Sequence, residues 1–276
     1  MMVLMVTFES FVAIILAVIG AAMGSFAGAA VWRLKHKRDI VRDRSECEHC
    51  HHKLGALDLV PVVSWLALGG KCRYCRKPIG KSALALELVM AAYFVISYLA
   101  WPYGLTTGLE WLALVLWLIM GVGLAILFVY DLRWFLLPDK VMYPLMAVAG
   151  VLFVLRAVAE SWSPGVFIVE LVLALLAVAG FYGFIYTVSK GEWVGFGDVK
   201  LGVVIGLTLG WQLSLLAVLI ANVVGTLVIL PGLATGKLTR RSRVPFGPFL
   251  IVGFVIAALF GQQILLWYAS LITPGF

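Results

Sequence analysis

The stretch "GFGDVKLGVVIGLTLGWQLSLLAVLIANVVGTLVILPGLATG", residues 195–236, decides the fold. After Lys200 it carries no charged residue over 36 positions. As one helix, those positions would be about 54 Å long at about 1.5 Å per residue, whereas the hydrocarbon core of a bilayer is about 30 Å thick. We therefore expect two membrane spans, over residues 199–210 and 212–232. The break is predicted at Gly210-Trp211-Gln212, because Trp and Gln suit the membrane interface.

The composition of the whole chain is that of a membrane protein. Of its 276 residues, 63% are hydrophobic and 13% are charged, whereas a soluble domain is about half apolar and about a quarter charged. Further apolar segments occur at about residues 10–32, 83–101, 110–130, 141–158, 166–189 and 248–271. The sequence therefore predicts an all-α polytopic membrane protein with about eight transmembrane helices. Segment 10–32 exceeds the apolar region of a signal peptide, about 7–15 residues, so we expect a retained helix.

The basic residues predict which loops face the cytoplasm. Twenty of the 21 Lys and Arg residues lie in four segments, 33–82, 131–140, 190–200 and 233–246. The positive-inside rule places such segments on the cytoplasmic side, and eight spans with both chain ends outside satisfy it. The net charge of +7 is then explained by the basic loops that hold the chain's orientation in the lipid bilayer, and no nucleic-acid partner is expected.

All four cysteines fall in the one sizeable polar segment, residues 33–82. They form two pairs, CEHC and CRYC, 21 residues apart: Cys47, Cys50, Cys72 and Cys75. This spacing is typical of a structural zinc ion bound by four thiolates. Three histidines near the first pair, His49, His51 and His52, are more often solvated than ligands. A segment of about 50 residues with few apolar side chains can hardly build a core, so a metal would hold it together.

The chain is thus expected to have three parts. These are a first transmembrane helix (1–32), a cytoplasmic zinc-binding insert (33–82) and a transmembrane domain (83–276).

Acidic residues near predicted membrane boundaries are the second group of candidates. Asp131 ends the third predicted span and Asp198 opens the sixth, on the same side at similar depth. Two carboxylates that approach each other cannot both ionise cheaply, so they share a proton. One can then act as general base on a water and the other as general acid toward a peptide bond. Gly195 and Gly197 would let the backbone approach closely and take unusual dihedral angles.

Other charged residues have simpler interpretations. Asp139 follows a proline and precedes a helix, so N-capping accounts for it. Lys200 either anchors a helix end at the membrane surface or tunes the charge near Asp198. Asp131 and Asp198 could also pair with Arg133 and Lys200, and a proton relay would use the same acids. Glu87 is a buried charge within the second span and a functional candidate for that reason.

Taken together, these segments resemble the bacterial prepilin peptidases, which are GxGD-type intramembrane aspartyl proteases. The matching stretches are GSF (24–26), DLVPVVSWLALGGKCRYC (58–75), DLRWFLLPD (131–139), GFGD (195–198) and PFGPFL (245–250), together with the CEHC pair. The resemblance runs from about residue 20 to residue 253.

The resemblance implies a fold, an activity and a set of site residues. Asp131 and Asp198 would be the catalytic aspartates, and the four cysteines would bind zinc. The enzyme would remove a short basic leader from type 4 prepilins or pseudopilins, at the cytoplasmic face of the bacterial inner membrane. It would then methylate the new N-terminus with S-adenosylmethionine, a step associated with the insert. No glycine-rich loop marks the methyl-donor site, so its residues are unassigned.

Two departures from the family pattern leave an enzyme with peptidase activity alone as an alternative. The segment after GSF lacks the usual asparagine, and "KSALALELV" keeps Glu87 without a Tyr-Pro. Presenilin-like proteases also pair Tyr-Asp with GxGD, but they carry Pro-Ala-Leu where this chain has PFGP. From other classes, a proton- or metal-coupled transporter or an assembly protein of a secretion system stays open. The transporter would use Asp131, Asp139, Asp198 and Glu87 as its relay.

Overall fold

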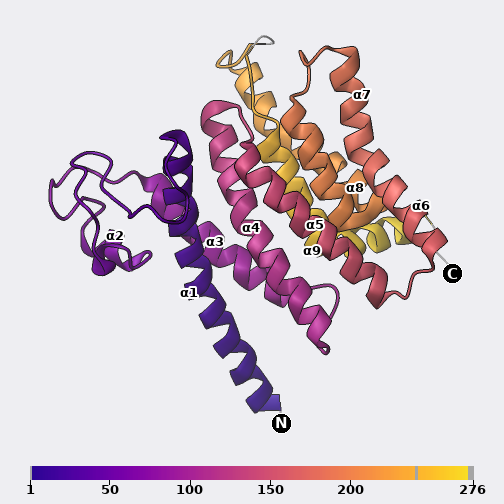
Figure 1. Cartoon of the computed structure of the whole chain (residues 1–276), viewed down its shortest axis with the longest axis horizontal. Helices are drawn as coiled ribbons and strands as arrows, with labels where there is room; N and C mark the ends of the chain where they lie inside the picture. Colours follow the sequence, from indigo (N-terminus) through magenta and orange to yellow (C-terminus); the bar gives the residue numbers. More distant parts are fainter. Residues whose placement is uncertain (1, 240–241, 273–276) are drawn as a thin grey trace. The chain divides into compact units, whose positions relative to one another are not determined.

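The computed structural model describes residues 2–239 and 242–272, and they are almost entirely helical (Figure 1). The chain divides into two compact units. Unit 1 comprises the chain up to Trp101 together with Gly121–Ile126, and unit 2 comprises Pro102–Met120 together with the chain from Leu127 onward.

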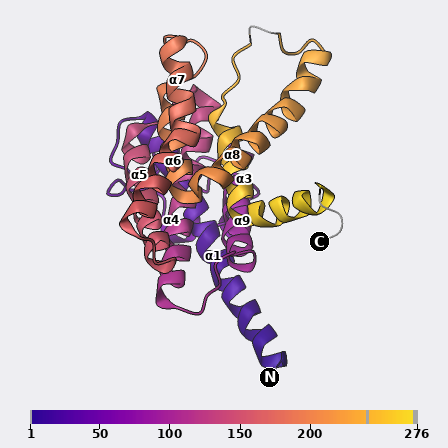
Figure 2. The same ribbon diagram turned by 90° about the vertical axis from the view of Figure 1, so that its right-hand side faces the viewer.

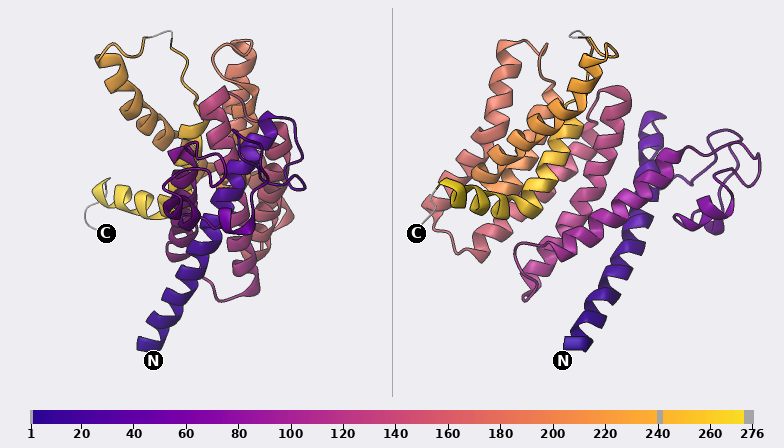
Figure 3. Two further views of the ribbon diagram at one scale, coloured as in Figure 1. Left: turned by 90° about the vertical axis from the view of Figure 1, so that its left-hand side faces the viewer. Right: turned by 180° about the vertical axis from the view of Figure 1, so that it is seen from behind.

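Unit 1 is built on two long helices, α1 (Met2–Lys35) and α3 (Lys81–Leu99), which lie side by side (Figures 1 and 3). Glycines allow this close packing. A Cβ atom added to Gly20 would lie 2.6 Å from the Met90 carbonyl oxygen, and one on Gly24 would lie 2.7 Å from Glu87 Cα. Small residues at such contacts are typical of helix packing in membranes. The insert between the two helices has only short elements, η1 (Ala56–Asp58) and α2 (Val63–Ala67).

Unit 2 holds the remaining helices in sequence order. They are α4 (Gly108–Trp134, whose centre belongs to unit 1), α5 (Asp139–Ala159), α6 (Pro164–Leu175), the π-helical turn η2 (Leu176–Gly180), α7 (Phe181–Val188), α8 (Phe196–Ala234) and α9 (Gly247–Ile272). Local signals set several of the ends. Thr107 and Glu110 form a capping box at the start of α4, and Ser163 caps α6, whose first residue is a proline. Phe135, in the left-handed conformation, ends α4.

The long helix α8 is broken at Gly210, as the sequence predicts. The backbone there has φ 73° and ψ 174°, which is not helical. The chain folds back at this point. The buried Ser214 hydroxyl, which donates to the Gly210 carbonyl at 2.5 Å, also lies 3.3 Å from the carbonyl oxygen of Ile205, nine residues earlier. In an unbroken helix those residues would lie about 13 Å apart along the axis. We call residues 196–209 the first arm and residues 211–234 the second arm.

Both ends of α8 lie at the same end of unit 2, next to the loops that precede and follow it (Figures 1 and 2). The first arm packs on α6 and η2, where Gly202 and Gly206 face the backbone of Ala179 and Ala174. The second arm packs on α9, whose Gly253 faces the backbone of Ala217. The two arms therefore run in opposite directions, each against a partner helix.

In the part of the chain that the structure describes, seven helices are long and apolar enough to cross a membrane. This confirms the predicted all-α multi-pass membrane protein. α8 counts once among the seven, whereas the eight spans expected from the sequence counted its two arms separately. The arrangement also agrees with the expectation that segments 190–200 and 233–246 share one side, although Arg240 and Arg241 lie outside the described residues.

Gly210→Ala is expected to destabilise the folded protein by about 1–3 kcal/mol, because the dihedral angles at this position are essentially restricted to glycine. The added Cβ would also lie 2.6 Å from Arg156 Nη1, which donates to the Leu209 carbonyl at 3.3 Å. The thermal unfolding midpoint of the purified protein in detergent measures the effect.

Gly150→Ala is the matched control. Gly150 is a helical glycine of α5 with open space where a Cβ would point. The substitution should be neutral, or stabilising by up to about 1 kcal/mol. Equal unfolding midpoints for the two variants would contradict the role of the break.

Candidate functional site

Asp131 lies in the last turn of α4 and is buried, with 6% of its surface exposed. Its carboxylate accepts a hydrogen bond from the backbone N–H of Gly247, the first residue of α9. A buried charge is costly unless it is hydrogen-bonded, so this N–H helps to hold the carboxylate in place. The contact joins two elements that are 116 residues apart in the chain.

Asp198 lies in the first turn of α8. The backbone N–H of Gly195 donates to its Oδ2 at 3.3 Å, which fixes the carboxylate at the start of the helix. Asp198 is partly buried, and it lies within the electrostatic reach of Asp131. The structure thus brings together the two acids that the sequence singled out, one from each of two helices.

The Leu137 side chain, which follows the end of α4, lies against the start of α8 at Gly197 and the start of α9 at Gly247. A Cβ on Gly197 would lie 3.0 Å from Leu137 Cβ, and one on Gly247 would lie 3.5 Å from Leu137 Cδ2 and 2.6 Å from Asp131 Oδ2. The backbone at Gly197 thus lies close to the Leu137 side chain, whereas a Cβ on Gly195 would meet nothing nearer than Asp198 Oδ2 at 3.6 Å. The expectation of unusual dihedral angles is wrong for both glycines of GFGD: Gly195 is extended, with φ −75° and ψ 149°, and Gly197 is not among the positive-φ residues.

Two aromatic residues that the sequence analysis did not single out complete this region. Tyr182 of α7 is buried and lies within the electrostatic reach of Asp198. Its ring packs edge-on against Phe246, with centroids 6.0 Å apart, and Phe246 directly precedes Gly247. Tyr182 sits in an apolar helix with no distinguishing spacing, so only the tertiary structure reveals it.

Lys200 pairs with Asp139 rather than with Asp198. Its Nζ lies 2.6 Å from Asp139 Oδ1 and 3.5 Å from the Tyr143 hydroxyl, and it also lies over the Tyr143 ring. N-capping as the explanation of Asp139 is wrong, because Pro138 occupies the cap position and Asp139 is the first helical residue. The ion pair ties the start of α8 to the start of α5, beside the two carboxylates.

In unit 1, the four predicted cysteines form one cluster. The sulfur atoms of Cys47, Cys50, Cys72 and Cys75 all lie within 4.8 Å of one another. Cys47 Sγ and Cys75 Sγ are 3.8 Å apart, which is about the edge of a tetrahedron of sulfurs around a metal at about 2.3 Å. Four converging thiol groups are positioned to bind a metal ion.

The cluster favours the ionised form of sulfur, which binds metal, at Cys72 but not at Cys50. The His52 N–H favours ionisation of Cys50, but burial and the neighbouring Cys47 and Cys75 thiols outweigh it and raise the pKa of Cys50 to about 11. Burial opposes ionisation of the Cys72 thiol. Backbone N–H groups of Cys75 and Tyr74, with the Cys47 and Cys75 thiols, outweigh that effect and lower its pKa to about 7. One thiolate is therefore available near neutral pH even before a metal neutralises its charge.

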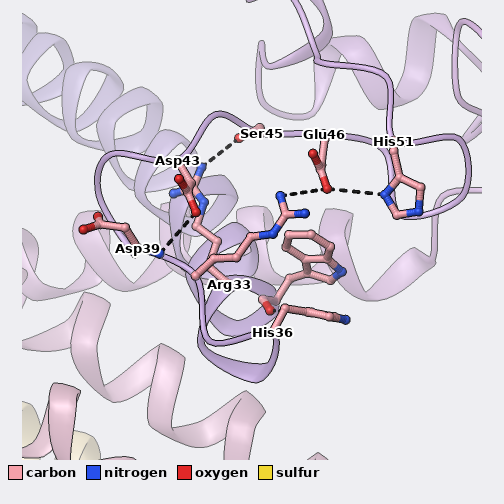
Figure 4. Close-up of polar contacts among 9 residues, drawn as sticks. Arg33, His36, Asp39, Asp43, Ser45, Glu46 and His51 are labelled. Atoms are coloured by element: carbon pink, nitrogen blue, oxygen red, sulfur yellow. Dashed lines mark hydrogen bonds and ion pairs between the residues drawn. The ribbon is translucent and has the colours of Figure 1, made fainter.

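The first cysteine pair is anchored to the end of α1 by polar contacts (Figure 4). Arg33 is buried and donates to the Ile40 carbonyl at 2.6 Å and to the Ser45 hydroxyl at 3.2 Å. Glu46, next to Cys47, accepts from Arg38 at 2.9 Å and from His51 at 3.4 Å. The Arg38 hydrogen bond lowers the pKa of Glu46 and keeps this carboxyl ionised.

The second pair is anchored to η1. Asp58 accepts from Arg73 at 2.6 Å, from the Tyr74 hydroxyl at 3.3 Å and from the Gly55 N–H at 3.1 Å. The Arg73 contact is the main cause of the lowered pKa of Asp58. Ion pairs and hydrogen bonds thus hold the segments that carry both cysteine pairs.

Glu87 connects α3 to the insert. It is buried, with 8% exposed, and its Oε2 accepts from the backbone N–H of Val62 at 2.7 Å. Val62 has φ 61° and ψ −52°, a positive-φ conformation that is a clear outlier for a β-branched residue. The carboxylate therefore holds a strained turn of the insert against α3, close to Gly24 of the GSF stretch.

Fold and site together define a multi-pass helical membrane protein with a carboxylate pair in one unit and a four-thiol cluster in the other. The sequence matches the Bacterial Peptidase A24 N-terminal domain over residues 18–101 and the Type IV leader peptidase family over residues 118–230. The chain belongs to the type IV leader peptidase family.

Curated relatives carry the name prepilin leader peptidase/N-methyltransferase. The one from Bacillus subtilis is 30% identical over 262 residues, which are 93% of this chain and 98% of the relative. The one from Stutzerimonas stutzeri is 33% identical over 222 residues, 80% of this chain and 73% of the relative. The one from Aeromonas hydrophila is 32% identical over 232 residues, which are 84% of this chain and 77% of the relative. No solved structure matches the chain.

Glu87→Leu is expected to loosen the insert, because the Val62 N–H loses its acceptor at a cost of about 1–3 kcal/mol. Limited proteolysis of the purified protein would then cut residues 56–68 faster than in the wild type. Glu87→Gln is the control, since its amide oxygen can still accept the bond and should largely restore protection. If Glu87→Leu is as resistant as the wild type, this contact does not hold the turn.

Proposed function

We propose that the protein removes the leader peptide from type 4 prepilins or pseudopilins, with Asp131 and Asp198 as its catalytic pair, and then methylates the new N-terminus. The observation that carries the proposal is the approach of the two carboxylates from α4 and α8, in a chain that belongs to the type IV leader peptidase family. The Gly247 N–H and the close approach at Gly197 support it, because they fix the backbone around the pair.

The pair can hydrolyse a peptide bond without a covalent intermediate. One carboxylate takes a proton from a water, whose oxygen attacks the carbonyl carbon of the bond. The other carboxyl group, protonated because two close acids share a proton, gives its proton to the leaving nitrogen. The carbon–nitrogen bond breaks, and the products are a leader carboxylic acid, which then loses its proton to water, and a free amine. The two acids then hold one proton between them again.

The reaction is proposed to take place at the cytoplasmic face of the bacterial inner membrane. Asp131 and Asp198 lie at helix ends, at the same end of unit 2 as the basic loops that flank α8. The positive-inside rule favours the cytoplasm for those loops. Water reaches a helix end at the membrane surface more readily than the bilayer centre, and hydrolysis needs that water.

The insert is proposed to bind one structural zinc ion through Cys47, Cys50, Cys72 and Cys75. A site closed by four thiolates leaves no position for substrate, so the metal supplies folding energy rather than chemistry. Apart from Cys47 and Cys72, no apolar side chain of the described insert is buried, which is why a metal is needed. S-adenosylmethionine would supply the methyl group: the free amine nitrogen would attack the methyl carbon, the sulfur–methyl bond would break to release S-adenosylhomocysteine, and the methylated amine would lose a proton to water.

Asp131→Asn and Asp198→Asn should each reduce leader removal by about a hundredfold or more, because an amide can neither take nor give the proton. Mass spectrometry of a precursor incubated with the purified protein, with and without S-adenosylmethionine, reads cleavage and methylation together. Asp139→Asn is the control. Asp139 is half exposed and pairs with Lys200, and loss of such a pair is worth about 1 kcal/mol or less. Normal cleavage by either Asp131→Asn or Asp198→Asn would contradict the proposal that these two aspartates form the catalytic pair.

Cys72→Ser should abolish zinc binding, make the insert sensitive to protease and reduce methylation, while cleavage survives at least in part. The reason is that the sulfur cluster belongs to unit 1 and the carboxylate pair to unit 2. Metal analysis of the purified protein should find one zinc per wild-type chain and almost none in the variant. A wild-type protein that is folded but free of zinc would contradict the structural role.

A further inference from the structure

We infer that a groove between the second arm of α8 and the start of α9 binds the apolar helix of a membrane-inserted precursor. This inference rests on the proposed function and adds the surface that receives the substrate. The groove has a volume of about 240 Å³ and is lined by Asn222, Gly225, Thr226, Ile229, Leu230, Leu233, Phe246 and Phe249.

One face of the second arm forms the main wall of the groove. Its lining residues recur three and four positions apart along α8, which is the spacing of a single helical face. Gly225 forms the floor, where the absent side chain leaves room for Phe249: an added Cβ would lie 3.3 Å from that ring. Glycine on a helix face is typical of places where another helix approaches closely in a membrane, and at Gly225 that helix is α9. α8 and α9 can be followed in Figure 2.

The groove ends at the two carboxylates. Phe246 lines the groove, and its ring packs against Tyr182, which lies within the electrostatic reach of Asp198. The next residue, Gly247, donates its N–H to Asp131. The end of the groove at Phe246 is therefore one residue away, along the chain, from the N–H that Asp131 accepts.

Two polar side chains on this face point to a peptide occupant. Asn222 and Thr226 are exposed, and their Nδ2 and Oγ1 donate only to carbonyls of their own helix, those of Val218 and Asn222, each at 2.8 Å. Polar residues of membrane helices usually face a protein interior or a partner. In the groove, the amide oxygen of Asn222 remains available to a polar group of an occupant.

The occupant that fits these features is an apolar helix. A helix satisfies its own backbone hydrogen bonds, so it can lie in the lipid beside the second arm. The cavity accepts side chains rather than a whole helix, as when knobs from one helix enter holes on another. A lipid chain would fill the apolar part but would offer no donor to the amide oxygen of Asn222, whose Nδ2 already donates to the Val218 carbonyl. A second copy of this protein is the other occupant that the test distinguishes.

The test compares bulky substitutions on two faces of the second arm. Thr226→Trp and Leu230→Trp fill the groove, whereas Leu227→Trp places the same ring on a neighbouring face that is 66% exposed. The groove variants should raise KM by about tenfold for a precursor that includes its apolar helix, with kcat little changed, because only binding is lost. For a short soluble peptide that spans the cleavage site, all three variants should match the wild type.

The result overturns the inference if the groove variants leave KM for the precursor unchanged, or if Leu227→Trp raises it equally. It is also overturned if Thr226→Trp alters only the oligomeric mass of the protein, since the groove would then join two copies.

Photocrosslinking separates this inference from the proposed chemistry. A benzophenone side chain at position 230 should capture the precursor, and one at position 227 should not. If the wild type cleaves nothing while position 230 crosslinks, the chemistry is wrong and the docking stands. If cleavage occurs without a crosslink at 230 and without a KM effect, the docking is wrong and the chemistry stands.

Discussion

The backbone at Gly210 is the constraint on which the rest of unit 2 depends. α8 has 39 residues and almost no charge, so as a straight helix it would measure about 59 Å, nearly twice the thickness of the hydrocarbon core. The left-handed φ at Gly210 turns the second arm back, and the Ser214 hydroxyl, which donates to the Gly210 carbonyl, lies against the Ile205 carbonyl on the other side of the turn. As a result, the start of α9 returns to the end of the unit where α8 began.

That return assembles the carboxylate region. Gly247 meets Asp131 only because the second arm brings the chain back past the end of α4. Phe246 meets Tyr182 for the same reason. The site is therefore made of segments that are far apart in sequence, and its glycines serve close contact with Leu137 and Asp131 rather than unusual dihedral angles. The groove along the second arm is a product of the same fold-back.

The insert of unit 1 is stabilised by directional polar interactions and not by an apolar core. It is too small and too polar to form an apolar core, and large side chains such as Leu57, Val63 and Leu66 remain more than half exposed within the described residues. Four thiols, two carboxylates that accept from arginines, and the buried acceptor Glu87 replace the missing core. These are directional interactions, so they fix the turns of the insert even though little apolar surface is buried.

The sequence by itself determined the class of fold, the break at Gly210-Trp211-Gln212, the four-cysteine cluster and the two acids at helix ends. These features depend on length, apolar composition and short-range spacing, which are properties of the chain alone. Tertiary structure decided the partners. Lys200 pairs with Asp139, Glu87 with the Val62 N–H, and Asp131 with the Gly247 N–H. No pattern predicted these three contacts, because each joins residues at least 25 positions apart whose distance is set by how helices pack. The packing of Tyr182 on Phe246, 64 positions away, was unpredicted for the same reason.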